Sequence, residues 1–160
     1  MRIGTRLGAG LLTGLSLAAA AAAAPQEVPL SPALRAFLQS EMRGIASGVQ
    51  AITVALATAE WDQVVREAVK IRDSYIRHRE LSELQRRELE ALPAGFHALD
   101  AAFHERAGRL AAAAGAHDGE LAAYQLHRLV EGCVACHSQY VRYRFTGFGA
   151  PAAAEHEHQH

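Results

Sequence analysis

Apolar side chains recur with helical spacing along the first part of the chain that follows an alanine-rich start. Between Ser31 and Thr58 the steps from one apolar residue to the next are three or four positions, which is the period of an α-helix with one buried face. The members of this stripe are Leu34, Leu38, Met42, Ile45, Val49, Ile52 and Leu56. Ser31 can accept a hydrogen bond at a helix start, and Pro32 suits the first helical position. The pattern therefore predicts a first helix of about 26 residues.

Three further segments carry the same periodicity. A second helix is expected from near Glu60, a third over residues 94–114, and a fourth from Asp118, which can cap it, to the glycine at position 147. Gly115 is expected to stop the third helix as a residue just past its C-terminus. The apolar positions are Trp61, Val64, Val65, Ala68, Ile71 and Tyr75, then Phe96, Leu99, Phe103 and Leu110, then Leu121, Tyr124 and Leu129.

The region between the second and third helices is highly charged. Ser82 and Gln85 have the spacing of a capping box, so residues 77–90 are expected to form either a short helical connector or an extension of the second helix. Val, Ile and Thr are sparse whereas Ala and Leu are abundant, which disfavours a β-rich fold. Four amphipathic helices joined by short links predict an all-α protein, an antiparallel four-helix bundle.

The first 24 residues have the pattern of a secretory signal peptide. Arg2 and Arg6 precede an uncharged run that ends in four alanines and Pro25, and cleavage is expected after Ala24. The alternative is a membrane anchor, but a run of about 17 residues rich in Ala and Gly is short and weakly apolar for a span. We therefore expect a periplasmic domain over residues 25–148 with no stable membrane anchor after cleavage, followed by a disordered tail over residues 149–160.

The charge balance excludes one class of partner. The chain has 16 basic and 17 acidic residues, a formal net charge of −1. Without a basic surplus to neutralise phosphates, nucleic-acid binding is not expected. From residue 155 onward the tail reads Glu-His-Glu-His-Gln-His, and we expect it to be solvated, with weak chelation of a divalent metal as the alternative.

The most specific chemical signal is the sequence Cys133-Val-Ala-Cys136-His137 on the fourth helix. Cys-x-x-Cys-His is the attachment motif of c-type haem. Residues at i, i+3 and i+4 share a helix face. Cys133 and Cys136 can therefore hold one porphyrin edge through two thioether bonds while His137 reaches the iron as its proximal ligand. The chain has two cysteines, and both belong to the motif, which predicts one covalently attached c-type haem.

Three other chemistries use the same residue types. A redox-active Cys-x-x-Cys pair normally opens a helix after a strand, whereas this pair stands toward the end of a helical chain. A zinc site needs a fourth ligand, and His104 and His127 do not have the usual spacing to the pair. A disulfide between Cys133 and Cys136 would form in the periplasm if haem were never attached.

The motif and its position resemble class II c-type cytochromes, the cytochrome c-prime group. In that group the haem motif lies near the end of the last helix of a four-helix bundle, and here Cys133 to Tyr140 stand on the fourth expected helix. The resemblance covers about residues 28–148 and implies covalent haem near the C-terminal end of helix four, with Tyr140 packed near it. The group often has an arginine after this tyrosine, but Val141 stands there, so the role of that arginine does not carry over.

The resemblance also implies that a residue of the first helix faces the iron from the far side. Low-spin members have methionine there, and Met42 is the one methionine besides the initiator. The alternative is that Met42 fills the core, as methionine does in irregular gaps. His97, Asp100 and His104 share one face of the third helix and are expected to form a polar seam in which Asp100 holds one imidazole. His104 is the reserve distal ligand.

These residues favour an electron carrier over an enzyme. Ligation by Met42 and His137 would suit single-electron transfer to a redox partner protein in the periplasm. The alternative is a five-coordinate cytochrome that binds NO or CO, and a weaker one is a haem peroxidase, for which no distal acid–base pair can be placed by spacing. Proteins of the group often pair through their first two helices, so a homodimer is compatible with the stripes.

Overall fold

The computed structural model describes residues 28–74 and 81–148. The expected signal peptide over residues 1–24 and the expected tail over residues 149–160 lie outside these described residues. Within them all regular structure is helical and no strand occurs, which confirms the all-α prediction. No helix in this part of the chain is long and apolar enough to cross a membrane.

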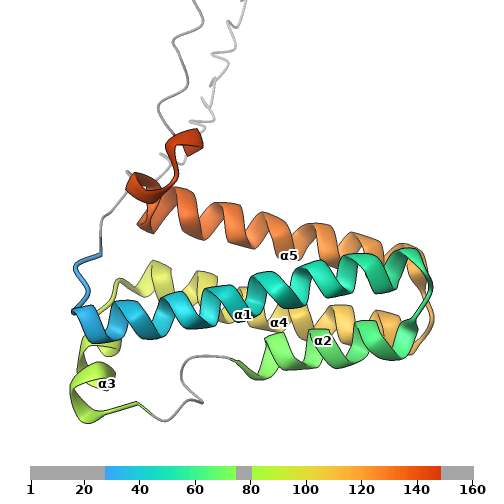
Figure 1. Ribbon diagram of the computed structural model, residues 1–160, viewed down its shortest axis with the longest axis horizontal. Coiled ribbons are helices and arrows are strands. Elements are labelled where there is room, and N and C mark those ends of the chain that lie inside the picture. Colours follow the sequence, from blue (N-terminus) through green and yellow to red (C-terminus); the bar gives the residue numbers. More distant parts are fainter. Residues whose placement is uncertain (1–27, 75–80, 149–160) are drawn as a thin grey trace, which may run out of the picture.

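Four long helices build the molecule (Figure 1). They are α1 (Pro32–Ala57), α2 (Trp61–Asp73), α4 (Ala94–Gly115) and α5 (Gly119–Tyr140), and the short α3 (Glu83–Glu90) lies between α2 and α4. Helices that follow one another run in opposite directions, and α1 packs on α2, α2 on α4, and α4 on α5. The contact between α1 and α5 is much smaller than these three. The arrangement fits the expected antiparallel four-helix bundle, with its least closed side between α1 and α5.

The helix starts follow the local sequence signals. The Ser31 hydroxyl accepts a hydrogen bond from the Leu34 N–H at 3.2 Å, and the Asp118 carboxylate accepts one from the Leu121 N–H at 2.9 Å. Ser82 and Gln85 form the expected capping box at the start of α3. Of the two interpretations of the charged region, the short connector is confirmed and the extension of the second helix is wrong, because α2 ends at Asp73.

Two helix ends differ from the prediction. Gly115 is the last residue of α4, and the left-handed residue that reverses the chain is His117, with φ of 56°. The N–H of Asp118 bonds to the carbonyl of Ala113 at 3.0 Å across this turn, as in a Schellman motif. Ala59, with φ of 57°, is the left-handed residue that reverses the chain between α1 and α2. Both turns therefore place a side chain where glycine is the easier residue.

The fourth long helix ends earlier than expected. It stops at Tyr140 rather than near residue 147, because Val141 leaves the helical region of backbone space at φ −136° and ψ 26°. The chain then continues as two short 3₁₀ turns, η2 (Arg142–Arg144) and η3 (Thr146–Phe148). The turns change the direction of the chain directly after the Cys-x-x-Cys-His segment.

The interior has two apolar clusters. The first fills the space between the four long helices, where Ile52, Val64, Leu110 and Leu129 are completely buried. Its members are Ile45, Ile52, Ala55, Val64, Ala68, Ile71, Ala107, Leu110, Ala111, Ala113, Ala114, Ala122 and Leu129. Alanine is the commonest of these residues, and its small side chain allows the helices to approach closely.

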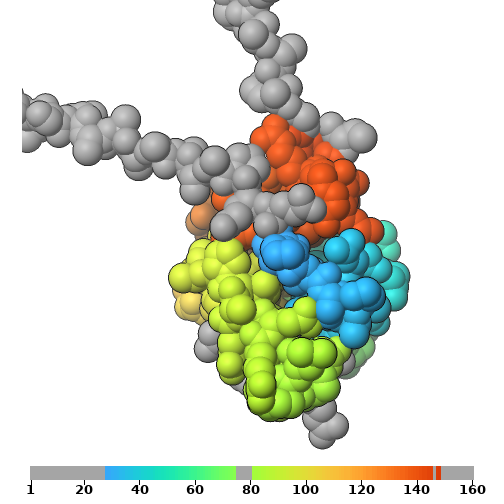
Figure 2. All heavy atoms as spheres, turned by 90° about the vertical axis from the view of Figure 1, so that its left-hand side faces the viewer, coloured from blue at the N-terminus to red at the C-terminus, as the bar shows by residue number. Residues whose placement is uncertain are grey.

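The second cluster lies at the opposite end from the two tight turns and includes Val28, Leu89, Leu92 and Tyr140. Figure 2 faces this end, where the start of α1, the region of α3 and the C-terminal turns come together. A polar contact also joins them, because the backbone N–H and the hydroxyl of Ser31 donate to the two carboxylate oxygens of Glu88 at 2.9 and 2.7 Å. A carboxylate at the start of α1 also complements the helix dipole.

Candidate functional site

A cavity of about 300 Å³ lies between the two apolar clusters, with walls from α1, α4 and α5. Its lining residues are Met42, Ile45, Ala46, Val49, Leu99, Asp100, Phe103, His104, Val130, Gly132, Cys133, Cys136 and His137. Most of these side chains are apolar, and the polar ones are few, which is typical of a ligand or cofactor pocket. Of the six site residues expected from the sequence, five line this cavity and Tyr140 does not.

The α5 wall carries the motif. Cys133, Cys136 and His137 follow one another at helical spacing on the same face, and all three are partly buried. Both cysteines are free thiols, and the thiol of Cys133 donates to the carbonyl of Leu129 at 3.6 Å within its own helix. The local sequence therefore places two thiols and one imidazole together at one side of an apolar cavity.

The protonation states follow from burial. Burial raises the pKa of the Cys133 thiol, and burial together with the nearby Asp100 carboxylate and Cys133 raises the pKa of Cys136 to about 11. Both thiols therefore keep their protons at neutral pH, unlike the low-pKa thiol of a redox-active Cys-x-x-Cys pair. Burial lowers the pKa of the His137 imidazole, which favours the neutral form that can bind a metal.

The α1 wall contributes Met42, whose environment differs from that of its neighbours on the stripe. Ile45 and Ile52 are buried in the first cluster, whereas the Met42 side chain is 42% exposed at the cavity. The interpretation of Met42 as a core filler is therefore wrong for this structure. Its thioether lies on a different wall from His137, as a distal ligand requires.

The α4 wall holds the expected polar seam. The Nδ1 atom of His104 lies 2.6 Å from the carbonyl oxygen of Ile71, so Nδ1 carries a proton and donates it. The Nε2 atom faces the Asp100 carboxylate at 3.4 Å, which confirms that Asp100 holds one imidazole. Both ring nitrogens of His104 are thus engaged within the protein, and the residue is 6% exposed. Its role as the reserve distal ligand stays a prediction.

Two buried polar atoms at this seam have no hydrogen-bond partner among the described residues. They are Nδ1 of His97 and the second carboxylate oxygen of Asp100. Buried polar groups are rarely left unpaired in folded proteins. Because Asp100 also lines the cavity, the unpaired oxygen stands where a bound group with a polar edge would find a partner.

Tyr140 lies outside the cavity. It is 5% exposed in the second cluster, where its ring meets Phe96 edge to face with ring centroids 5.5 Å apart. It packs beside Cys136, and its hydroxyl lies against Gly95. The expected packing of Tyr140 near a haem stays a prediction.

The structure also brings in an aromatic residue that sequence reasoning missed. The ring of Phe145 stacks on the His137 imidazole, with centroids 4.9 Å apart and an angle of 21° between the planes. Helical spacing could not reveal this pair, since the chain leaves the helix at Val141. Phe103 and Gly132, also missed, shape the cavity wall together, because a Cβ atom at Gly132 would lie 3.3 Å from the Phe103 ring.

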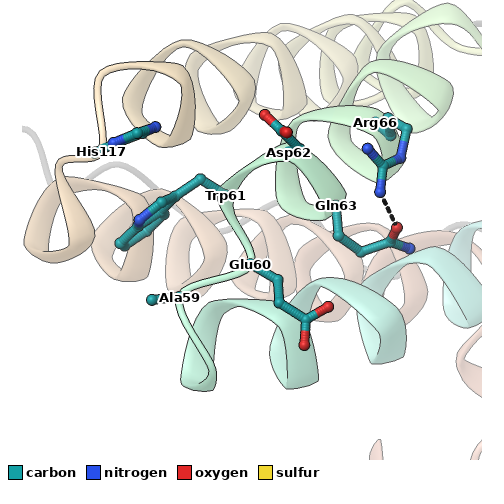
Figure 3. A pocket seen from close by; sticks show the side chains of 7 residues that line it. All are labelled: Ala59, Glu60, Trp61, Asp62, Gln63, Arg66 and His117. Atoms are coloured by element: carbon teal, nitrogen blue, oxygen red, sulfur yellow. Dashed lines mark hydrogen bonds between the residues drawn. The ribbon is translucent and has the colours of Figure 1, made fainter.

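A second hollow, of about 460 Å³ and more open, lies at the end with the tight turns (Figure 3). Trp61 and His117 stack there with ring centroids 5.6 Å apart, and Arg66 donates to the side chain of Gln63 at 2.6 Å. None of the expected site residues lines this hollow. Nowhere in the part of the chain that the structure describes do three or more His, Cys, Asp or Glu side chains gather as a metal-ion site.

Comparisons of the chain with protein-family models, with curated proteins and with solved structures found no match.

Proposed function

We propose that this protein is a c-type cytochrome that carries single electrons on one covalently attached haem. One observation carries the proposal: the thiols of Cys133 and Cys136, the imidazole of His137 and the thioether of Met42 line the same apolar cavity. The motif by itself supplies the first three residues. The cavity adds the fourth, from a helix about ninety positions earlier in the chain.

The residues at the cavity fit a haem in several respects. Apolar walls suit the porphyrin face, and the two unpaired, partly buried thiols are the groups that thioether attachment uses. The His137 imidazole is held neutral by burial, as iron ligation requires.

Each residue has a defined part in this proposal. Cys133 and Cys136 hold the haem, His137 is the proximal ligand, and Met42 is the distal ligand. A haem iron with these ligands supplies reversible one-electron exchange, and a methionine ligand raises its reduction potential. Ile45, Leu99 and Phe103 add apolar surface to the cavity lining, and an apolar shell around a haem also tunes its reduction potential.

The exposed apolar residues at the cavity suit transfer to another protein rather than conversion of a substrate. Met42 and Val130 line the cavity and are also exposed at the surface. A redox partner protein can approach such a rim without entering the fold. Together with the expected signal peptide, this leads us to propose a periplasmic carrier without enzymatic activity and without a membrane anchor after cleavage.

The first experiment tests attachment. The full chain is expressed with export and c-type haem maturation, and the variants Cys133→Ala, Cys136→Ala and the double variant are compared with Val134→Ala, an exposed position inside the same motif. We expect the parent and Val134→Ala to keep haem through acid–acetone extraction and the double variant to lose it. Haem that resists extraction from the double variant, or a parent chain that never acquires haem, would contradict the proposal.

The second experiment separates the electron carrier from the gas-binding alternative. With Met42 as ligand, the oxidised parent shows a methionine-to-iron charge-transfer band at the red edge of the visible spectrum, and reduced Met42→Ala binds CO faster than the parent. Val54→Ala, at an exposed position farther along α1, is the matched control, and it should change neither the charge-transfer band nor the rate of CO binding. A high-spin parent that binds CO rapidly, with no change in Met42→Ala, would instead identify a five-coordinate protein that binds NO or CO.

A further inference from the structure

The contact between Phe145 and His137 has no counterpart in the motif and is built by the chain beyond α5. We infer that Phe145 is a positioning residue: its stacked ring sets the plane of the His137 imidazole and shields one face of it from water. This inference rests on the proposed function in one respect, namely that His137 is the iron ligand. The stacking itself is a property of the polypeptide.

The need for such a residue follows from the hydrogen bonds of His137. A histidine that binds a metal usually donates its second ring N–H to a carbonyl or a carboxylate, which fixes the orientation of the ring. Among the described residues, no hydrogen bond to either ring nitrogen of His137 is formed, whereas His104 has its Nδ1–H on the Ile71 carbonyl. The stacked ring of Phe145 is thus a contact that can restrain the His137 ring.

The chain after α5 is folded so that this ring is held in place. Val141 leaves the helix, the N–H of Phe145 bonds to the carbonyl of Arg142 at 3.1 Å, and the N–H of Phe148 bonds to the carbonyl of Phe145 at 3.0 Å. The ring of Phe148 meets that of Phe145 edge to face, with centroids 5.9 Å apart. Backbone turns and a second aromatic ring therefore hold Phe145 in place.

Phe145 also stands clear of the cavity. It is absent from the cavity lining, while His137 belongs to it, so the imidazole has the cavity on one side and the phenyl ring over one face. Phe145 is 41% exposed and belongs to neither core cluster, so its replacement leaves the packing between the long helices in place. A change of this residue can therefore alter the His137 ring without unfolding the bundle.

The test uses four variants of the full chain. Phe145→Leu keeps apolar volume but loses the flat ring, Phe145→Tyr keeps the ring and serves as the rescue, and Tyr143→Leu removes an exposed aromatic residue of the same turn. Phe148→Leu removes the supporting ring. The inference predicts that Phe145→Leu changes the readouts below, Phe145→Tyr restores them, Tyr143→Leu leaves them unchanged, and Phe148→Leu has an intermediate effect.

The first readout needs no haem. In NMR spectra of the haem-free chain, the imidazole carbon-bound protons of His137 are shifted upfield by the stacked ring and show NOEs to Phe145. Phe145→Leu abolishes the upfield shift, and Phe145→Tyr retains it. Parent spectra with neither the shift nor the NOEs would overturn the stacking, and with it the inference.

The second readout uses the haem-loaded chain. The EPR g-values of the oxidised iron depend on the orientation of its imidazole ligand, so Phe145→Leu should broaden or shift them and lower the reduction potential as water reaches His137. Identical g-values and potentials in the parent and Phe145→Leu would overturn the positioning role even if the NMR contact were present. A parent chain that acquires no haem would refute the proposed function instead. The NMR readout uses the haem-free chain, so that result would leave it unaffected.

Discussion

The two halves of the bundle differ in the helices that build them and in how closely those helices pack. At the end with the tight turns, α1, α2, α4 and α5 are all present, and alanines pack in the interior together with the completely buried Ile52, Val64, Leu110 and Leu129. At the other end α2 has stopped at Asp73, and a cavity separates the first cluster from the second. All the side chains with candidate chemistry lie in this second half.

The difference shows how a bundle can hold a cavity without losing its core. Stability is concentrated where small residues let four helices approach, since close packing supplies most of the apolar burial. The open half is held by contacts of another kind: the second cluster, the Ser31–Glu88 hydrogen bonds and the aromatic turn after α5. Substitutions in the two halves should therefore have different consequences.

The largest effect is expected from shortening a buried side chain in the closed half, the end of the bundle with the tight turns. Leu110→Ala removes a completely buried side chain and should lower the free energy of unfolding by about 2–5 kcal/mol. Met42→Ala in the haem-free chain removes a side chain that is 42% exposed at an existing cavity, and should cost less than about 1 kcal/mol. Urea unfolding followed by circular dichroism measures both, and equal losses would contradict the division into a closed and an open half.

A smaller effect is expected from two glycines of the open half. A Cβ atom at Gly95 would lie 2.6 Å from the Tyr140 hydroxyl, so Gly95→Ala must displace a buried ring and should cost about 1–3 kcal/mol. Gly44 in α1 has nothing within 4 Å of the same position, and Gly44→Ala should stabilise the helix by about 0.5–1 kcal/mol. Thermal unfolding of Gly95→Ala and Gly44→Ala measures both effects. Changes in stability of the same sign in the two variants would contradict the prediction.

The buried thiol predicts a pH dependence confined to the haem-free chain. The pKa of Cys136 is raised from its ordinary value of 9.0 to about 11, so its contribution to stability is complete below pH 9 and is lost as the pH rises toward 11. The loss should be on the order of 1–2 kcal/mol, since one pKa unit corresponds to about 1.4 kcal/mol and the thiol is not fully buried.

Urea midpoints measured from pH 8 to pH 11 test this dependence. Cys136→Ala should flatten the decline in the haem-free chain. Conversion of both thiols to thioethers should flatten it as well, because a thioether does not titrate. If the urea midpoint of Cys136→Ala fell by the same amount between pH 8 and pH 11, the decline would belong to titratable groups other than Cys136.

The smallest effect concerns the two left-handed turn residues of the closed half. Ala59→Gly relieves the strain at φ 57° and should stabilise the protein by about 0.5–1 kcal/mol. His117→Gly relieves the same strain but also removes the ring that stacks on Trp61, so its net gain should be smaller. Differential scanning calorimetry of the two variants decides the order, and a larger gain for His117→Gly would show that the stack contributes nothing.

The local features of this protein could be predicted from its sequence. The start of α1 at Pro32, the capping box at Ser82 and the cap at Asp118 each depend on residues three positions apart, and the structure has all three. The placement of Cys133, Cys136 and His137 on one face is likewise local, because helical spacing sets it. Hydrogen bonds and side-chain periodicity within a few residues carry all of this information.

The tertiary structure decided which of the candidate residues can meet. The backbone carbonyl of Ile71, more than thirty positions before His104, accepts the hydrogen bond from its Nδ1–H, a contact that helical spacing could not reveal. The separation of α1 from α5 leaves Met42 exposed at a cavity, although the stripe places it with buried residues. The turn at Val141 brings Phe145 onto His137. The first two outcomes depend on how whole helices pack against one another, and the third depends on where the backbone leaves the helix. The period of a single helix does not contain that information.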